Sequence, residues 1–155
     1  GCAHGIREFG FYAMNALRLE KSFGIWSAEF TQDRTPAMTG MDRWIDWTKT
    51  DFIGRDAALE VRQNDTASQR LVALEIDADN ADASGYEPVW LHNRRIGFTT
   101  SGGYGHYTGK SLAMALVDRY IGDDAELSVH VVGKLRDAQI LTEPAWDPSG
   151  ERMRA

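Results

Sequence analysis

The stretch that decides the fold runs from Glu87 to Val117 and reads EPVWLHNRRIGFTTSGGYGHYTGKSLAMALV. It predicts two short strands, Val89 to Leu91 and Arg95 to Thr100, joined by a polar turn. A glycine-rich loop from Ser101 to Gly109 follows and leads into a third apolar run, Leu112 to Val117. Because glycines allow positive φ and close backbone approach, this loop either contacts a ligand or turns the corner of a barrel.

The end of this loop, Gly109-Lys110-Ser111, is similar to the end of a phosphate-binding P-loop. That motif needs a glycine five positions before its last glycine, where this chain has Tyr104. It also needs a helix after it, whereas Leu112 to Val117 alternates as a buried strand does. A glycine corner between two strands is therefore favoured over a nucleotide site.

The composition of the 155 residues narrows the class of protein. The net charge of −6 argues against nucleic acid as the main partner, because phosphate binding needs a basic face. Apolar residues make up 43% of the chain, and they are too dispersed along the sequence to form a membrane-spanning helix. The single cysteine, Cys2, excludes an internal disulfide framework and favours a reducing compartment. We therefore expect a cytoplasmic protein, or one of the mitochondrial matrix in a eukaryote, with neither nucleic acid nor membrane as partner.

The first twenty residues change period. Gly5 to Ala16 places its apolar residues on one helical stripe. Leu17 and Leu19 then alternate with Arg18 and Glu20, which predicts a strand. On such a strand Glu20 would be a solvated surface carboxylate.

Aromatic residues are dense between Phe23 and Trp47, where they fill a core or an interface more often than they stack on a heterocycle. A short helix is predicted from Arg55 to Arg62. Its inward residues are expected to be Ala57, Ala58 and Val61. The small polar stretch from Gln63 to Gln69 predicts the one domain boundary.

Beyond this boundary the pattern is all-β. Arg70 to Ile76 predicts a strand, and Glu126 to Val132 with Leu135 to Leu141 predicts a hairpin across Gly133-Lys134. Short strands separated by turn signals are typical of a small antiparallel barrel. The fold class is therefore mainly β with a helical leader, an α+β arrangement.

Residues suited to catalysis or metal binding are few. The histidines are His4, His92, His106 and His130. They share no metal-ligand spacing with each other or with Cys2, so we expect no metal site. His106, in the glycine corner, is the one histidine with a functional interpretation. Ser101 and Ser111 near it are not part of a nucleophile elbow.

Several motifs follow one another in an informative order. They are ALRLEKSFGIWSAEF at 16–30, Thr35-Pro36, DFIGR at 51–55, RRIGFTTSGGYGHYTGKSLAMALV at 94–117 and EPAWDP at 143–148. Together they resemble the glycine-cleavage T-protein (aminomethyltransferase) family. The SGGYGH corner and the GERMR end are more similar to the T-protein-like halves of flavin-dependent dimethylglycine or sarcosine dehydrogenases.

The resemblance implies that residues 1–68 are the end of a folate-binding domain and residues 69–155 the family's C-terminal β-barrel. It implies binding of tetrahydrofolate, which receives a one-carbon unit from a small amine substrate in the catabolism of glycine or methylated amines. It also implies FAD in a fused or partner domain. The family's catalytic aspartate lies in an N-terminal region that we expect this chain to lack. That region would then be its partner, and the chain alone would be inactive.

Site residues follow from the same resemblance. Glu20 matches the glutamate of LRLE that holds the pterin, and a carboxylate can accept two parallel hydrogen bonds from such a ring. Trp146 matches an aromatic residue that borders the folate pocket. The family's basic residue after Thr-Pro corresponds to Arg43, Lys49 or Arg55, and the resemblance does not choose among them.

Two hypotheses remain. The chain is either the C-terminal part of a folate-dependent one-carbon transferase, or a barrel that serves as a structural or interaction module without folate chemistry. Glu20 keeps the family pattern, whereas Met38 replaces its usual acidic residue. If the rest of a domain is missing, we expect exposed apolar side chains that favour self-association. These would come from Phe9, Phe23, Trp26 and Trp44.

Overall fold

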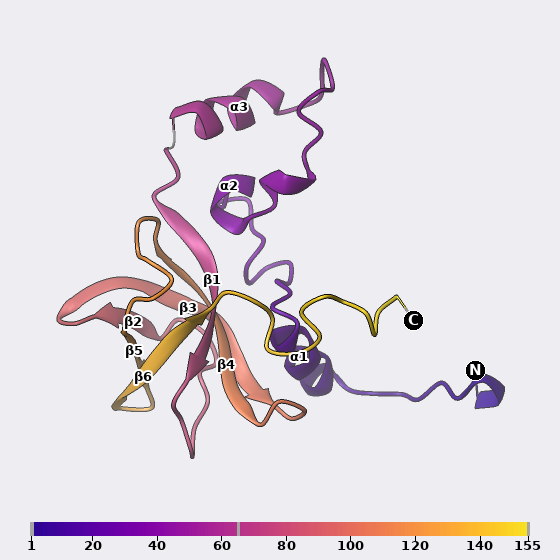
Figure 1. Cartoon of the computed structure of the whole chain (residues 1–155), viewed down its shortest axis with the longest axis vertical. Coiled ribbons are helices and arrows are strands. Elements are labelled where there is room, and N and C mark those ends of the chain that lie inside the picture. Colours follow the sequence, from indigo (N-terminus) through magenta and orange to yellow (C-terminus); the bar gives the residue numbers. More distant parts are fainter. Residues whose placement is uncertain (1, 65, 155) are drawn as a thin grey trace.

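The computed structural model describes residues 2–64 and 66–154, which form a barrel and a leader that lies beside it (Figure 1). Six antiparallel strands close the barrel in the order β1-β4-β3-β2-β5-β6. The strands are β1 (Gln69–Ile76), β2 (Pro88–Leu91), β3 (Arg94–Gly105), β4 (Lys110–Asp118), β5 (Leu127–Val131) and β6 (Lys134–Leu141). The predicted small antiparallel barrel, with a helical leader before it, is confirmed.

Strand β4 links the barrel to the leader because it is buried on both faces. Its inward residues, Ala113, Ala115 and Val117, belong to the barrel core with residues such as Leu74 and Val129. Its outward residues Leu112 and Met114 pack against Leu19 of the leader. The apolar run is therefore a strand covered on both sides, which explains its lack of polar positions.

The hairpin between β3 and β4 differs from the prediction. Strand β3 continues through Gly105, so the turn is confined to residues 106–109 instead of 101–109. Gly109 alone among the loop glycines has a positive φ, at 69°. Gly102 is needed for a different reason: a Cβ atom there would lie 2.4 Å from the carbonyl oxygen of Ala83. The glycines thus permit close approach within a strand more than they turn a corner.

The leader contains short helices joined by irregular chain. They are η1 (Cys2–His4), α1 (Phe11–Glu20), α2 (Pro36–Thr39), η2 (Asp42–Trp44) and α3 (Arg55–Asn64). Two predictions for α1 were wrong: it begins at Phe11 instead of Gly5, and it includes residues 17–20, where a strand was predicted. A four-residue alternation is too short to separate the two periods, since Ala16 and Leu19 also share a helical face.

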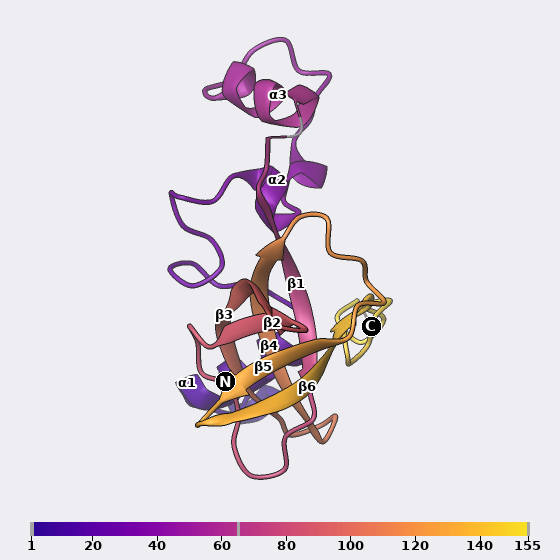
Figure 2. The ribbon, with the colours of Figure 1, turned by 90° about the vertical axis from the view of Figure 1, so that its left-hand side faces the viewer.

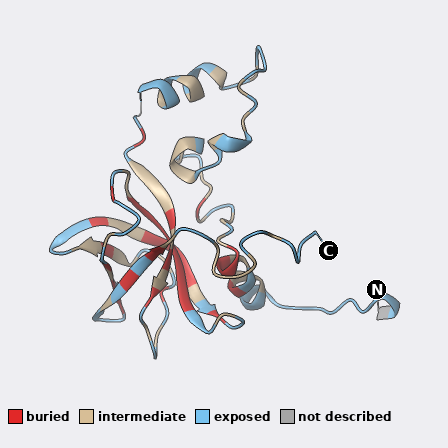
Figure 3. Ribbon diagram, viewed as in Figure 1, coloured by how far each residue is buried: buried red, intermediate tan, exposed pale blue. Residues whose placement is uncertain are grey.

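Helix α3 is present where it was predicted, but none of its described residues is buried, and Ala57 is exposed. Of the three residues predicted to face inward, Ala57 is therefore misplaced, while Ala58 and Val61 are half-buried. The helix stands beyond one end of the barrel (Figure 2), and buried residues are concentrated in the strands and in α1 (Figure 3). The guanidinium of Arg62 lies 4.6 Å from the ring centroid of Trp47, a contact within the leader itself.

Candidate functional site

Glu20 lies where three segments meet: the end of α1, the β3–β4 turn and the C-terminal tail (residues 142–154). Its side chain is 2% exposed. Its Oε1 accepts hydrogen bonds from the backbone N–H groups of Tyr107 at 2.8 Å and Thr108 at 2.9 Å, and from the Thr108 hydroxyl at 3.3 Å. The local prediction of a solvated carboxylate was therefore wrong, because the helix turns Glu20 toward the hairpin.

The tail brings Trp146 to the same place. The backbone N–H of Trp146 donates to the backbone carbonyl of Glu20 at 3.0 Å. The indole meets the ring of Tyr107 edge-on, with ring centroids 5.7 Å apart. Two residues named by resemblance, 126 positions apart in the chain, thus lie next to each other, and Tyr107 contacts both.

Lys21 fastens the tail to the end of α1. Its Nζ lies 3.4 Å from Oδ2 of Asp147 and also donates to the Asp147 carbonyl oxygen. The ammonium lies 5.6 Å from the ring centroid of Trp146 and 5.9 Å from that of Phe23, both within cation–π range. Burial disfavours the charged carboxylate, but hydrogen bonds from the Arg152 N–H and Lys21 outweigh it and hold the pKa of Asp147 below its ordinary value.

The candidate basic residues lie in different places. Arg43 is exposed, and it lines a groove of about 750 Å³ together with Lys21 and Phe23. Lys49 is exposed and does not line this groove, while its carbonyl oxygen accepts a hydrogen bond from Nε of Arg55 at 3.1 Å. The structure therefore brings Arg43 to a groove that Lys21, the neighbour of Glu20 in the chain, also lines, and it leaves Lys49 and Arg55 outside this groove.

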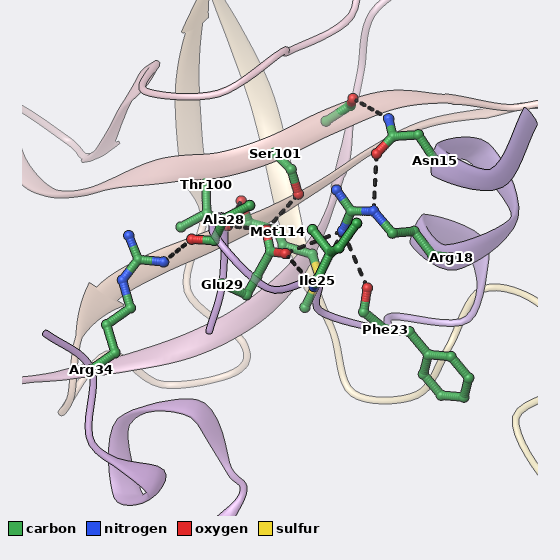
Figure 4. Close-up of polar contacts among 11 residues, drawn as sticks. Asn15, Arg18, Phe23, Ile25, Ala28, Glu29, Arg34, Thr100, Ser101 and Met114 are labelled. Atoms are coloured by element: carbon green, nitrogen blue, oxygen red, sulfur yellow. Dashed lines mark hydrogen bonds and ion pairs between the residues drawn. The ribbon is translucent and has the colours of Figure 1, made fainter. Parts of the chain in front are cut away.

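A buried polar network lies beside this site, centred on Glu29 (Figure 4). The carboxylate is 0% exposed. Its Oε2 lies 3.2 Å from Nη1 of Arg18 and accepts from the Ile25 N–H at 2.8 Å. Its Oε1 accepts from the hydroxyls of Thr100 and Ser101, each at 2.6 Å. Four donors therefore surround one carboxylate, which satisfies a buried charge.

A β-bulge makes this network possible. Thr100 and Ser101 are consecutive, and consecutive side chains of a regular strand point to opposite faces. The register of β3 against β4 shifts between Thr99 and Ser101. This irregularity turns both hydroxyls to the same side, where they meet Glu29.

Arg18 connects the network to helix α1. Its Nε donates to Oδ1 of Asn15 at 2.9 Å, and Nδ2 of Asn15 donates to the carbonyl oxygen of Gly102 at 3.2 Å. Burial lowers the pKa of Arg18 below its ordinary value, and Glu29 opposes this shift. Sequence reasoning did not find Glu29. The only sequence signal is an acidic residue between Ala28 and Phe30 in an aromatic-rich segment.

Residues 2–64 and 66–154 contain neither a metal-binding cluster nor a helix that could cross a membrane. They contain no group of three or more His, Cys, Asp or Glu side chains that could hold a metal ion. None of their helices is both long and apolar enough to cross a membrane.

Comparison with known families agrees with this architecture. Residues 69–147 match the family model described as the glycine cleavage T-protein C-terminal barrel domain, and residues 1–49 match the GCVT N-terminal domain. The chain belongs to the glycine cleavage T-protein family. The resemblance noted from its motifs is thereby confirmed.

Relatives within the T-protein family carry two names. Mitochondrial dimethylglycine dehydrogenase of Mus musculus is 37% identical over 158 residues, and the match covers 99% of this chain and 18% of that protein. Aminomethyltransferase of Thermotoga petrophila is 30% identical, and the match covers 94% of this chain and 39% of that protein. The crystal structure of glycine cleavage system aminomethyltransferase T from Bartonella henselae aligns with a TM-score of 0.78 at 25% identity. The alignment covers 88% of this chain and 38% of that one. The chain thus spans less than half the length of each.

Proposed function

We propose that this chain supplies one wall of a tetrahydrofolate site in a one-carbon (aminomethyl) transferase of glycine or methylated-amine catabolism. The observation that carries the proposal is the convergence on Glu20 of α1, the β3–β4 turn and the tail, with Trp146 and Tyr107 beside it. An aromatic edge beside a buried carboxylate suits a planar heterocycle that carries N–H donors. Tetrahydrofolate would act as acceptor of the one-carbon unit.

The hydrogen bonds that Glu20 already makes determine which of its oxygens could accept from a ligand. Oε1 already accepts three hydrogen bonds from the turn, whereas a carboxylate has about four lone-pair sites over its two oxygens. A ligand N–H is therefore expected at Oε2. A contact through both oxygens requires the turn at residues 106–109 to give way. Arg43, in the adjoining groove, is the basic residue best placed for a negatively charged part of the ligand.

We further propose that the partner of the leader is the rest of a GCVT N-terminal domain, in the same polypeptide or another. Residues 1–49 match the GCVT N-terminal domain, and the whole chain covers only 39% of the Thermotoga petrophila aminomethyltransferase. Large apolar side chains of this segment are exposed. The aromatic ones are Phe9, Phe11, Tyr12, Phe23, Trp26 and Trp44. The amine substrate and a flavin domain with FAD belong to the same proposal, supported by the dimethylglycine dehydrogenases among the relatives. Without such a partner the chain is expected to be catalytically inactive.

A second function, a barrel module without folate chemistry, is favoured by one observation. The carboxylate of Glu20 is buried and already serves the β3–β4 turn, so it has a structural role that requires no ligand. Met38, in place of the family's acidic residue, points the same way.

Titration of tetrahydrofolate decides between the two functions. The protein would be the chain preceded by a complete GCVT N-terminal domain, as wild type, Glu20→Gln and the control Glu60→Gln at an exposed carboxylate of α3. Glu20→Gln removes a charge and replaces one acceptor with a donor, at a cost on the order of 2–4 kcal/mol. Affinity should fall roughly thirtyfold or more, while the control binds as wild type.

The amide oxygen that Glu20→Gln introduces can still accept from the turn, so the fold should persist. Equal affinities for wild type and Glu20→Gln would contradict the proposal and leave Glu20 as a structural residue. Absence of binding in all three proteins would favour the module without folate chemistry.

A further inference from the structure

Helix α1 has little apolar surface with which to hold its position. Its buried residues are Ala16, Leu19 and Glu20. Of these, Leu19 alone joins an apolar cluster, with Leu112 and Met114 of β4. Apolar burial is favourable but non-directional, so one leucine on a small cluster does not fix the rotation of a helix.

The directional contacts of α1 come from polar side chains (Figure 4). Asn15 bonds to the backbone of β3 at Gly102. Arg18 bonds to Asn15, to the Phe23 carbonyl oxygen and to Glu29, which is itself held by β3. These hydrogen bonds connect the helix to one strand at defined points, which sets its rotation and its position along the barrel.

We infer that Glu29, acting through Arg18, is a positioning residue that holds Glu20 against the β3–β4 turn. Resting on the proposed function, it would thereby hold Glu20 for the ligand. Arg18 and Glu20 are two positions apart, about 200° around a helix with 3.6 residues per turn. Arg18 and Glu20 therefore hold α1 from two different directions around its axis. A rotation by one residue, about 100°, would move the carboxylate off Tyr107 and Thr108.

Stability alone does not account for this arrangement. Replacement of a buried ion pair by apolar residues of similar volume is often neutral or stabilising, so an Arg–Glu pair is a weak source of folding energy. Removal of one partner, by contrast, leaves an unpaired buried charge. A buried carboxylate with four directional donors is better suited to fixing one orientation.

The test uses amide hydrogen exchange, measured by NMR on the 155-residue chain without any ligand. In Glu29→Gln, Arg18 loses its buried counter-charge, and the NH₂ group replaces either the oxygen that accepts from Arg18 and the Ile25 N–H or the oxygen that accepts from Thr100 and Ser101. The amides of Tyr107 and Thr108, which report the position of Glu20, should exchange roughly tenfold faster or more. The amides of β1 and β4 should be unchanged.

A matched control is Glu87→Gln on the barrel. Glu87 also accepts hydrogen bonds from two backbone N–H groups, those of Ser84 and Gly85, and from a threonine hydroxyl. This variant should accelerate exchange at Ser84 and Gly85 and leave Tyr107 and Thr108 as in wild type. The comparison shows whether faster exchange at Tyr107 and Thr108 requires the loss of Glu29 in particular, or follows from the loss of any carboxylate that accepts from backbone N–H groups.

The double variant Arg18→Met with Glu29→Leu separates positioning from packing. It removes the charge pair but leaves the Ile25 N–H and the Ser101 hydroxyl without their acceptor, so melting should fall only modestly, while Tyr107 and Thr108 exchange faster and the amides of β1 and β4 do not. Wild-type protection at these two amides, in either Glu29→Gln or the double variant, would overturn the inference. So would equal acceleration of β4 in Glu29→Gln, because that reports global unfolding.

The folate arm is separate. In the longer protein used for the titration, Glu29→Gln should weaken tetrahydrofolate binding roughly tenfold or more if wild type binds. A wild-type protein that fails to bind contradicts the proposed function alone, because the exchange experiment contains no folate. Wild-type affinity in Glu29→Gln would contradict the inference that Glu29 serves the ligand site.

Discussion

The barrel and the leader differ in how much apolar surface they bury. The barrel, residues 69–141, encloses a continuous apolar core to which every one of its strands contributes. In the leader, α2, η2 and α3 have no buried residue among those described, and α1 joins an apolar cluster through Leu19 alone. Burial of apolar area is the main stabilising term in folding. The barrel can therefore hold its own structure, whereas the leader depends on a few specific contacts with it.

On the proposed function, most of the ligand-binding residues belong to the part with fewer contacts. Glu20, Lys21 and Arg43 all belong to the leader, and the barrel contributes the turn that receives Glu20. Segments with little apolar burial are the ones that open locally, so binding residues placed there can respond to a partner or ligand. The contrast between barrel and leader can be tested by substitutions in each, beginning with the strongest.

The largest effect is expected inside the barrel. Leu74 is 0% exposed, so Leu74→Ala should lower the free energy of unfolding by about 3 kcal/mol through lost burial and a cavity. Leu135→Ala, at an exposed position of β6, should change it by less than about 0.5 kcal/mol. Urea unfolding followed by far-ultraviolet circular dichroism measures both. Equal effects of the two variants would contradict a barrel held by its own core.

A smaller and local effect is expected in α1. Leu19→Ala should lower the free energy of opening of α1 by about 2 kcal/mol, because Leu19 is its one apolar anchor. Leu17→Ala, in the same helix but exposed, should have little effect. Amide exchange of α1 measures the loss, and exchange of β4 should not change. Parallel acceleration of β4 would mean that leader and barrel unfold together.

Exposed aromatic residues of the leader should cause self-association. Replacement of both Trp26 and Trp44 by Ser should weaken association roughly tenfold or more, because each exposed indole loses apolar surface. Leu135→Ser, on the barrel, serves as the control and should leave association unchanged. Sedimentation velocity over a concentration series measures it. A wild-type chain that stays monomeric at high concentration would contradict this prediction.

The smallest effect concerns pH and the tail. The pKa of Asp147 is held below its ordinary value, so its contribution is complete above about pH 3.9 and is lost as pH falls through the folded-state pKa. The tail should therefore detach from Lys21 in acid. The indole NMR signal of Trp146 should shift below about pH 4 in wild type and not in Asp147→Asn. The same shift in both proteins would assign it to another group.

Local patterns predicted the barrel because its strands are short and clearly punctuated. Leu112 to Val117 was predicted as a buried strand, and it is one, because its inner and outer side chains are both covered. Residues 17–20 were misjudged because four residues cannot distinguish the periods of a strand and a helix. The role of Gly102 was also missed, since it depends on the Ala83 backbone.

The candidate site could be predicted only in part. Glu20 and Trp146 were named by resemblance, and no local pattern indicated that they lie together. Glu29 was not found because its hydroxyl partners are 71 and 72 residues away and reach it only through a β-bulge. Lys21 was missed for the same reason, since its partner Asp147 is 126 residues away. Long-range pairs of this kind are set by the folded chain, not by neighbours in sequence.

The central claim is that the barrel is stable on its own and that the leader is held to it by few contacts. Native-state hydrogen exchange of the 155-residue chain in rising urea tests this claim. The amides of β1 and β4 should exchange only through global unfolding, those of α1 through a smaller opening of lower free energy, and those of α3 most easily. If α1 and β4 instead share one free energy and one urea dependence, leader and barrel form a single cooperative unit, which contradicts a barrel that is stable without its leader.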